Sequence, residues 1–342
     1  MATLKDIALS LNLSTMAVSK AMRNAPDISK ATKDRVMSEA RRLGYIPNQM
    51  ARSLRGGSSG LVGVVVPLLS DVYAAKMVQG LEEEASARGY QVLIGSSHGN
   101  VSRELELVNG MIGRRVEALF VYPMARIEQR RALLDLSTGR DVPIVFFHRY
   151  PAAASLYKNV GWVVADAQQG AEKITEYLLS KGHREMVYLS GEPASSFAAE
   201  HQAGYRRALM KAGLSVNDNM IFMAGSDIAG GSQAMARVLA EGTKFSAVIA
   251  ISDSAAIGAC EVLRKQGFKI PQDVSVVGFG DGALAEYYSA PLTTIHQSHA
   301  DMGKAAFNLW QQSLKAKDSL SGRHMAVELI ERGSVERVNL KK

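Results

Sequence analysis

The sequence is poor in cysteine, with a single residue, Cys260, among 342. No disulfide can form within the chain and no zinc site can be built on several cysteines, so Cys260 is expected to be a small core residue. No apolar run is long enough to span a bilayer, and the N-terminus lacks the basic-then-apolar pattern of an export signal. These absences predict a soluble, cytoplasmic protein.

Aromatic residues make up only 6% of the chain, which argues against a surface that stacks single-stranded bases. No Gly-x-x-x-x-Gly-Lys phosphate loop and no paired-histidine spacing is present, so we expect neither a cofactor nor a metal ion. Hydrophobic residues reach 47%, enough for large cores, and the length favours two or three domains.

Acidic residues are scarce at the N-terminal end. Residues 1–60 hold ten lysines and arginines against four acidic residues, so they carry six of the seven net positive charges. The remaining residues are nearly neutral. A basic end on a neutral body is the charge pattern expected for a polyanion partner.

This basic end contains three short helical patterns. Thr3 and Asp6 fit a capping box, and apolar residues follow at helical spacing. Ser14 and Ser29 are suitable N-caps for the second and third helices, and Gly44 fits the position after the last helix. Two short helices joined by so short a turn are typical of a helix-turn-helix, a DNA-binding motif.

The second helix is expected to enter the major groove with its N-terminal end first, which exposes Thr15, Met16, Ser19 and Lys20. Lys20 can donate to guanine, while Thr15 and Met16 can contact a thymine methyl group. Hydroxyl groups and helix N-termini predict phosphate contacts at Ser14, Ser29, Thr32 and Tyr45. The alternative, a helical interaction domain without DNA, is disfavoured because the outward residues are basic or hydroxylic.

Residues 56–60 are a Gly/Ser linker. The segment before it, residues 45–55, is too short for a stable isolated helix. It could fold against a paired copy on a minor groove, with Leu54 as an apolar wedge between base steps.

The N-terminal stretch resembles the lac repressor/galactose repressor family of bacterial transcription regulators. The matching segments are Leu4-Lys5-Asp6-Ile7-Ala8, Val18-Ser19-Lys20, Arg35-Val36, Gly44-Tyr45-Ile46-Pro47-Asn48 and Ala51-Arg52-Ser53-Leu54. The resemblance implies that residues 48–55 are a hinge helix that orders on operator DNA and contacts it through Asn48, Ala51, Arg52 and Leu54. Two residues depart from the family: Asn12 replaces a turn glycine, and Lys20 replaces an arginine, which weakens bidentate guanine recognition.

After the linker, apolar β-branched runs alternate with helical segments. The expected strands are residues 61–67, 90–95, 118–121, 143–147, 186–189, 247–251 and 274–279. Buried strands that alternate with helices predict parallel α/β sheets. There are too many units for one modest sheet, so we expect two similar lobes with a boundary near residues 164–166.

The family resemblance continues through the body. It is carried by Gly182-His183-Arg184, Ser252-Asp253 and residues 203–209, 271–279 and 291–295. It implies an all-α head (1–47), a hinge and linker (48–60) and an α/β body (61–342) of two lobes like a periplasmic sugar-binding protein. Lobe 1 would span about 61–164 and 293–325, and lobe 2 about 165–292 and 326–342, joined by three connections.

The resemblance also implies a small-molecule effector in the cleft between the lobes, at the strand carboxyl ends. Three residues match the family there: Tyr73 as an aromatic after the first strand, Arg149 after a strand end, and Asp253 in a Ser-Asp pair.

Four other effector positions depart from the family. His148 replaces a frequent aspartate, His201 an arginine that grips ligand hydroxyls, Gly280 an aspartate that accepts sugar hydroxyls, and Ser226 a common aromatic. Without the arginine and the aspartate, an ordinary hexose is a poor fit. The hypothesis is a bulkier ligand, or an acidic one near Arg149, His148 and His201. The alternative is a cleft that binds nothing in a protein regulated by a protein partner.

Two sequence patterns match motifs of catalytic or nucleotide-binding sites. Gly95-Ser96-Ser97-His98-Gly99 has the spacing of a nucleophile elbow, but polar residues separate Ser97 from the next helix. Residues 278–283 fit a dinucleotide fingerprint, but late in the chain rather than in a first βα turn. His183, between Gly182 and Arg184 before a strand, is expected to cap a turn. We therefore expect no enzyme.

The sequence thus predicts a homodimeric, sequence-specific DNA-binding regulator, most simply a repressor, that binds a near-palindromic operator under effector control. The rivals are a solute-binding protein without DNA function and a hydrolase that uses Ser97. The tail after Val327 has no heptad pattern, so no tetramerising coiled coil is expected.

Overall fold

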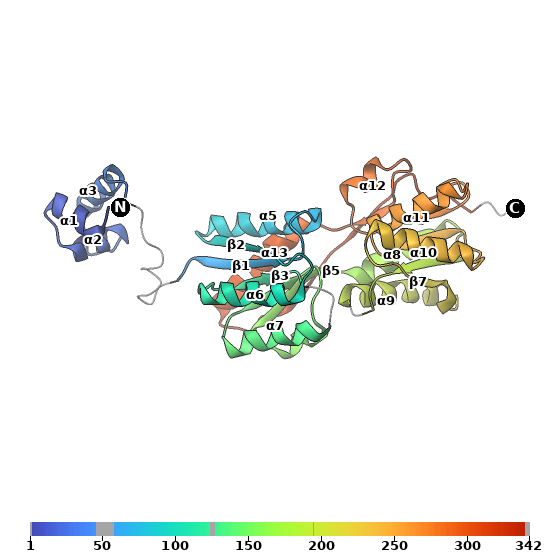
Figure 1. The fold of residues 1–342 in the computed structure, drawn as a ribbon, viewed down its shortest axis with the longest axis horizontal. Helices are drawn as coiled ribbons and strands as arrows, with labels where there is room; N and C mark the ends of the chain where they lie inside the picture. The colour runs from blue at the N-terminus through green and yellow to red at the C-terminus, as the bar shows by residue number, and fades with distance from the viewer. Residues whose placement is uncertain (1, 46–57, 124–126, 194, 339–342) are drawn as a thin grey trace. The chain divides into compact units, whose positions relative to one another are not determined.

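The computed structural model describes residues 2–45, 58–123, 127–193 and 195–338. The chain forms two compact units, Met1–Ser59 and Gly60–Lys342, which are the head and the body (Figure 1). None of the helices within the described ranges combines the length and apolar character that crossing a membrane requires.

The head consists of α1 (Leu4–Leu11), α2 (Thr15–Met22) and α3 (Lys30–Arg42). All three start at the caps that the sequence predicts. Thr3 and Asp6 form a complete capping box, and the hydroxyls of Ser14 and Ser29 accept hydrogen bonds from Ala17 N and Thr32 N. One buried residue pair from each helix makes the core: Ile7, Ala8, Val18, Ala21, Val36 and Ala40.

The turn between α1 and α2 explains why Asn12 can stand where the family has glycine. Asn12 adopts a left-handed backbone with φ of 54°, and its N–H donates to the last turn of α1. Asparagine tolerates this conformation better than other non-glycine residues. Gly44, with φ of 62°, ends α3 in the same region.

Lobe 1 of the body is a six-stranded parallel sheet in the order β11-β5-β4-β3-β1-β2. Its strands are β1 (Leu61–Val66), β2 (Gln91–Ser96), β3 (Leu119–Val121), β4 (Ile144–Phe147), β5 (Val160–Ala165) and β11 (Gly322–Met325). Its helices are α5 (Val72–Ala87), α6 (Val101–Gly113), α7 (Ile127–Gly139) and α13 (His299–Ala316). Helices α5 and α13 cover one face and α6 and α7 the other, so the strands are buried on both sides (Figure 1).

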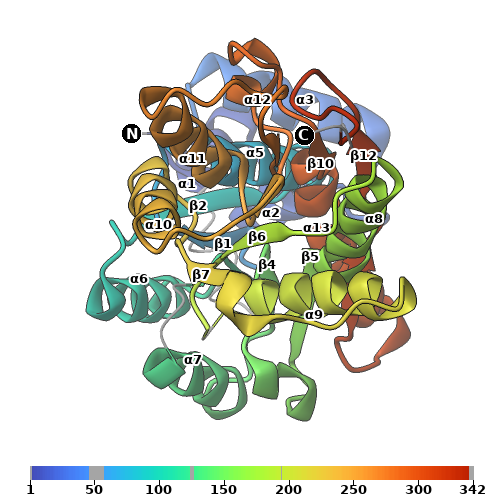
Figure 2. The same cartoon turned by 90° about the vertical axis from the view of Figure 1, so that its right-hand side faces the viewer.

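Lobe 2 repeats this plan with a four-stranded parallel sheet in the order β7-β6-β8-β9. The strands are β6 (Met186–Ser190), β7 (Ile221–Met223), β8 (Ala247–Ala250) and β9 (Ser275–Val277). Helices α8 (Ala167–Ser180) and α9 (Ser196–Lys211) pack on one face, and α10 (Ile228–Ala240) and α11 (Asp253–Lys265) on the other (Figure 2). A short helix, α12 (Ala283–Tyr287), follows β9.

The chain passes between the lobes three times: from β5 into α8, from β10 (Thr294–His296) into α13, and from β11 into β12 (Glu328–Ile330). Strands β10 and β12 pair with each other as a two-stranded antiparallel ribbon. The C-terminal part of the chain therefore completes both lobes.

Five strands are absent from the sequence-based prediction: β5, β7, β10, β11 and β12. Three of them, β7, β10 and β12, are only three residues long, too short for a period to be visible. Strand β11 is mostly exposed and polar, so its sequence lacks the apolar run of a buried strand. Strand β5 is apolar and buried, and it ends at the predicted boundary between the lobes.

Candidate functional site

One face of α2 presents the four residues predicted to read bases. Thr15, Met16, Ser19 and Lys20 recur at helical spacing, while Val18 and Ala21 fill the core behind them. Met16 is a large apolar side chain that is 69% exposed. This combination of one apolar, two hydroxyl and one cationic group suits the edges of base pairs.

Lys20 forms an ion pair with Asp27 at the surface of the head. Its Nζ lies 2.5 Å from Asp27 Oδ2 at the surface, and this hydrogen bond lowers the pKa of Asp27. Any other anion that bound Lys20 would have to displace this carboxylate. An exposed ion pair is worth little, so the exchange costs little.

The predicted phosphate contacts lie at the starts of α2 and α3. The Ser14 and Ser29 hydroxyls cap their helices at 3.1 and 3.2 Å, and the Ser29 and Thr32 hydroxyls are 2.9 Å apart. Tyr45 is half-buried against the head core. Asn48, Ala51, Arg52 and Leu54, the predicted hinge contacts, lie outside the described residues.

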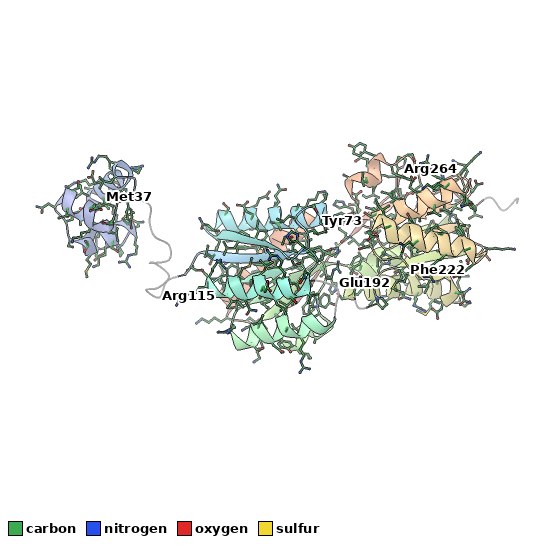
Figure 3. All side chains as sticks on the ribbon, in the orientation of Figure 1. Met37, Tyr73, Arg115, Glu192, Phe222 and Arg264 are labelled. Carbon is green, nitrogen blue, oxygen red and sulfur yellow. The ribbon has the colours of Figure 1, made fainter. Side chains whose placement is uncertain are left out.

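The predicted effector residues gather where parallel strands of the two lobes end. Tyr73 follows β1, His148 and Arg149 follow β4, Asp253 follows β8 and Gly280 follows β9. Figure 3 shows Tyr73 at the end of lobe 1 that faces lobe 2. The carboxyl ends of parallel strands are the usual place for ligands in α/β proteins.

Asp253 is the most deeply buried carboxylate of this region, at 2% exposure. Its two oxygens accept hydrogen bonds from Thr294 Oγ1 at 2.5 Å and from Gly282 N at 2.7 Å. Burial raises its pKa, and these two donors oppose the rise. The Tyr73 hydroxyl lies 3.5 Å from the same carboxylate, across the lobe boundary.

Imidazole and aromatic rings of both lobes form a continuous series of contacts. His148 stacks on Phe197 with ring centres 5.5 Å apart, and Phe197 and His201 both contact Phe279. On the other side His299 stacks on Tyr73 at 4.4 Å. The series joins lobe 1 to lobe 2 without a charged pair.

The three histidines of this series are held neutral. Burial lowers the pKa of His201 to about 3 and that of His299 to about 4, and with the charge of Arg149 it lowers the pKa of His148. Among the described residues, His148 Nδ1, His201 Nε2 and His299 Nε2 find no hydrogen-bond partner. Within those ranges no cluster of three or more potential metal-binding side chains occurs.

The proton on His201 can be placed. The buried Tyr188 hydroxyl is 2.7 Å from His201 Nδ1, which is its sole acceptor among the described residues. Tyr188 therefore donates to Nδ1, and the neutral ring carries its proton on Nε2. His201 thus carries a buried N–H donor on Nε2 that has no partner among the described residues.

Arg149 adds a second unpaired donor. Its guanidinium donates to the Tyr122 hydroxyl at 3.1 Å and lies 5.0 Å from the centre of that ring. Its Nε is buried without a partner, and in the described part of the chain no carboxylate forms an ion pair with it. A ligand that offers acceptor oxygens would satisfy both Arg149 and His201.

Ser226 lies at the surface beside Ser252, the residue that precedes Asp253. Its side chain is exposed, and its carbonyl accepts a hydrogen bond from Ser252 Oγ at 2.9 Å. Conversely, the sequence-based prediction lacks Tyr122, Phe197, Thr294 and His299. A search for polar or aromatic residues just after each strand would have found His299, which follows β10, and Tyr122, which follows β3.

The catalytic and nucleotide patterns fail on geometry. Ser97 is fully buried, and α6 begins only at Val101, so no exposed nucleophile sits on a strand-to-helix turn. A Cβ on Gly278 would lie 2.3 Å from Asp253 Oδ1, so side chains fill the space beside this glycine. Both ring nitrogens of His183 are hydrogen-bonded, to Ser246 Oγ and Glu336 O, as expected of a structural histidine.

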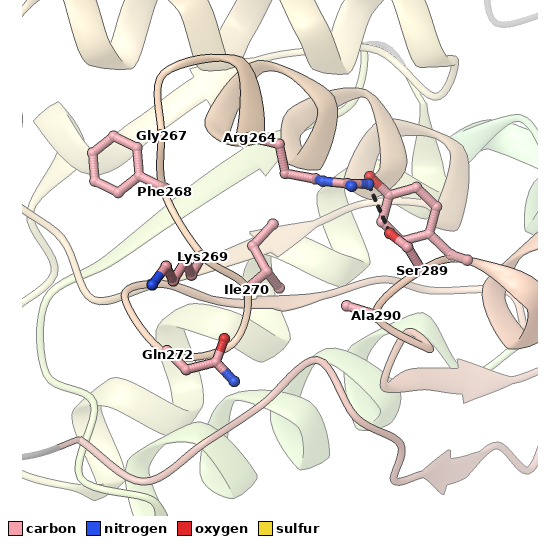
Figure 4. A pocket seen from close by; sticks show the side chains of 9 residues that line it. Arg264, Gly267, Phe268, Lys269, Ile270, Gln272, Ser289 and Ala290 are labelled. Carbon is pink, nitrogen blue, oxygen red and sulfur yellow. Dashed lines mark hydrogen bonds between the residues drawn. The ribbon is translucent and has the colours of Figure 1, made fainter.

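A hollow of about 420 Å³ lies elsewhere on lobe 2, after α11 (Figure 4). Its rim includes Arg264, which donates to Ser289 Oγ at 2.7 Å, and the exposed Lys269. Among the described residues, none of the side chains that line it carries a buried polar atom without a hydrogen-bond partner, in contrast to His148, Arg149 and His201.

Comparison with known protein families gives two adjoining matches. The model described as "Bacterial regulatory proteins, lacI family" matches residues 3–48. The model described as "Periplasmic binding proteins and sugar binding domain of LacI family" matches residues 59–332. Together they span the head and most of the body.

Individual relatives agree in length and architecture. The HTH-type transcriptional repressor PurR of Vibrio campbellii is 28% identical over 340 residues, covering 99% of this chain and 100% of the relative. PurR of Photobacterium profundum is 29% identical over 341 residues with the same coverage. Among solved structures, a lac repressor dimer bound to operator and an anti-inducer has a TM-score of 0.84 at 24% identity, covering 98% of this chain and 99% of that one. The transcriptional regulator CelR in complex with cellobiose has a TM-score of 0.74 at 25% identity, covering 98% and 100%.

Proposed function

The chain belongs to the lacI family of bacterial regulatory proteins, and from this premise we propose that it is a DNA-binding transcriptional repressor controlled by a small molecule. It is a regulator rather than an enzyme. The observation that carries the proposal is the head, in which three capped helices expose Thr15, Met16, Ser19 and Lys20 on one face of α2. Full-length likeness to repressors named PurR supports it.

In this proposal α2 lies in the major groove and reads bases, while the starts of α2 and α3 bind phosphates through Ser14, Ser29 and Thr32. Tyr45 adds a phosphate contact at the end of the head. The hinge residues Asn48, Ala51, Arg52 and Leu54 bind the minor groove. Two chains pair so that their heads occupy two half-sites of a near-palindrome in the cytoplasm, where chromosomal DNA is accessible.

The effector binds between the lobes, near Tyr73, His148, Arg149, His201, Asp253 and Gly280. The unpaired donors of Arg149 and His201 favour a small molecule rich in acceptor oxygens, with an acidic group against Arg149. The effector changes operator affinity because it binds one relative orientation of the lobes better than the other.

Selection of duplex sites from random DNA with the full-length protein tests the DNA-binding part. We expect one enriched near-palindrome, with an affinity that falls steeply as salt rises. Met16→Ala and Lys20→Ala should change the enriched sequence, whereas Lys5→Ala, an exposed lysine of α1, should leave it unchanged. Binding without any sequence enrichment would contradict the proposal.

Calorimetric titration with sugars, sugar phosphates and nucleobases tests the effector part. We expect binding by acidic members of the panel and its loss in Arg149→Met. Silence across the whole panel would refute small-molecule control and favour a protein partner.

A further inference from the structure

One side chain reaches from lobe 1 to lobe 2 among the predicted effector residues. Tyr73 is the second residue of α5 in lobe 1, and its hydroxyl lies 3.5 Å from Oδ2 of Asp253, the first residue of α11 in lobe 2. Figure 3 labels Tyr73 at the end of lobe 1 that faces lobe 2. The contact joins two residues that were both expected to touch a ligand.

Two glycines of lobe 2 make room for this hydroxyl. A Cβ on Gly280 would lie 2.7 Å from Tyr73 Oη, and a Cβ on Gly282 would lie 2.6 Å from it. The next contact of a Cβ on Gly282 would be Tyr73 Cζ at 3.4 Å, an ordinary distance. The obstruction at residue 282 is therefore a single atom, the phenol oxygen.

The Asp253 carboxylate can accept this hydrogen bond, and the Tyr73 hydroxyl can donate it. Asp253 takes one donor on Oδ1, from Thr294, and on Oδ2 the Gly282 amide, which leaves Oδ2 room for one more donor. Burial and the charge of Asp253 raise the pKa of Tyr73, so the phenol keeps its proton and donates. Stacking on His299, at 4.4 Å and 20°, fixes the direction of the ring.

A second tyrosine bridges the lobes elsewhere. Tyr150, after β4, donates to Glu200 of α9 at 2.9 Å, and its backbone N–H donates to Ser196 Oγ at 3.2 Å. The closed arrangement of the lobes thus has hydrogen bonds of its own, without a ligand.

We propose that Tyr73 is an internal occupant of the effector cleft: its hydroxyl takes the place beside Asp253 that a ligand hydroxyl would take, and it closes lobe 1 on lobe 2 in the ligand-free protein. Tyr73 also determines specificity, because it withholds Asp253 from polyhydroxylated ligands and leaves the nitrogen donors of Arg149 and His201 for recognition. The regulatory meaning of this closure rests on the proposed function; the closure itself does not.

The test is a double-mutant cycle in the full-length protein without DNA or ligand, followed by hydrogen–deuterium exchange with mass spectrometry. Tyr73→Phe keeps the ring and removes the hydroxyl. Gly282→Ala, at a backbone φ of −71° that alanine adopts freely, displaces the hydroxyl. At 3.5 Å the hydrogen bond is long and weak, so its loss should raise the open fraction of the two lobes about twofold. Peptides covering residues 71–79 and 279–288 should then exchange about twofold faster in either variant, while peptides of β2 should not change.

The variant with both Tyr73→Phe and Gly282→Ala tests whether the phenol oxygen causes the faster exchange. With phenylalanine at residue 73 the added methyl group meets no phenol oxygen, so Gly282→Ala should add nothing to the effect of Tyr73→Phe. Full additivity, or unchanged exchange in Tyr73→Phe, would overturn the proposal. If Gly282→Ala failed to fold, Tyr73→Phe alone would decide. Because no DNA is present, the result is readable even if the protein proved not to bind an operator.

Discussion

At the scale of single residues, the body gathers histidines that must remain neutral. His201 and His299 are buried and His148 is half-buried in one region, and loss of solvent is the first cause of the lowered pKa of each. In the unfolded chain the same groups titrate at about 6.5. A histidine whose folded pKa is depressed contributes stability that is complete above the unfolded pKa and is lost as the pH falls below it.

His201 makes this testable, because its folded pKa is about 3. Between pH 6.5 and pH 5 the wild-type free energy of unfolding should fall by about 1.5 kcal/mol through this histidine alone. In His201→Gln the decrease over this range should be smaller by that amount, as measured by urea unfolding at the two pH values. His98→Gln, at an exposed site, should keep the wild-type decrease; an unchanged decrease in His201→Gln would refute the assignment.

At the scale of helices and strands, three helix pairs cross at glycines. A Cβ on Gly80 of α5 would lie 1.9 Å from Ala300 O of α13, and one on Gly303 of α13 would lie 1.9 Å from Met77 O of α5. The pairs α8–α9 and α10–α11 repeat this at Gly204 and Gly231, with Cβ-to-carbonyl distances of 2.1 Å. The helices lie backbone against backbone, and any side chain at these points would force them apart.

Gly80→Ala and Gly303→Ala should therefore each lower the free energy of unfolding by about 3 kcal/mol, because a backbone carbonyl cannot rotate away as a side chain can. The matched control is Gly113→Ala at the end of α6, where a Cβ meets nothing within 4 Å. It should be neutral or stabilising by up to about 1 kcal/mol. Equal midpoints of thermal unfolding for Gly80→Ala and Gly113→Ala would contradict the close-packing argument.

The same scale shows what a sequence can and cannot reveal. The caps at Thr3, Ser14 and Ser29 were predictable because a cap bonds backbone atoms two or three residues away. Long buried strands such as β1 were predictable from their β-branched runs. By contrast, β11 is polar and finds its place only by pairing with β5, more than 150 residues earlier.

The site was predictable only in part for the same reason. Tyr73, Arg149 and Asp253 could be placed by resemblance to a family. That the Tyr73 hydroxyl would lie beside Gly280 depends on distances between separate lobes. No local pattern encodes these distances.

At the scale of the whole molecule, the head and the body are separate compact units, and the head carries most of the net positive charge. Removing residues 1–59 should abolish binding to duplex DNA while leaving the thermal midpoint of the body within about 2 °C of its value in the full-length protein. Electrophoretic mobility shifts and calorimetry would measure the two effects. Retained DNA binding would place the DNA-binding surface on the body instead.

The path of the chain through the lobes also has a consequence for synthesis on the ribosome. Lobe 1 begins at β1 but is completed by α13 and β11, which leave the ribosome after the whole four-stranded sheet of lobe 2. The head is complete after its first 45 residues and can fold at once, because domains fold as units while translation continues. A nascent or prematurely terminated chain would thus present a finished head on an unfinished body: a DNA-binding domain that no effector can yet control.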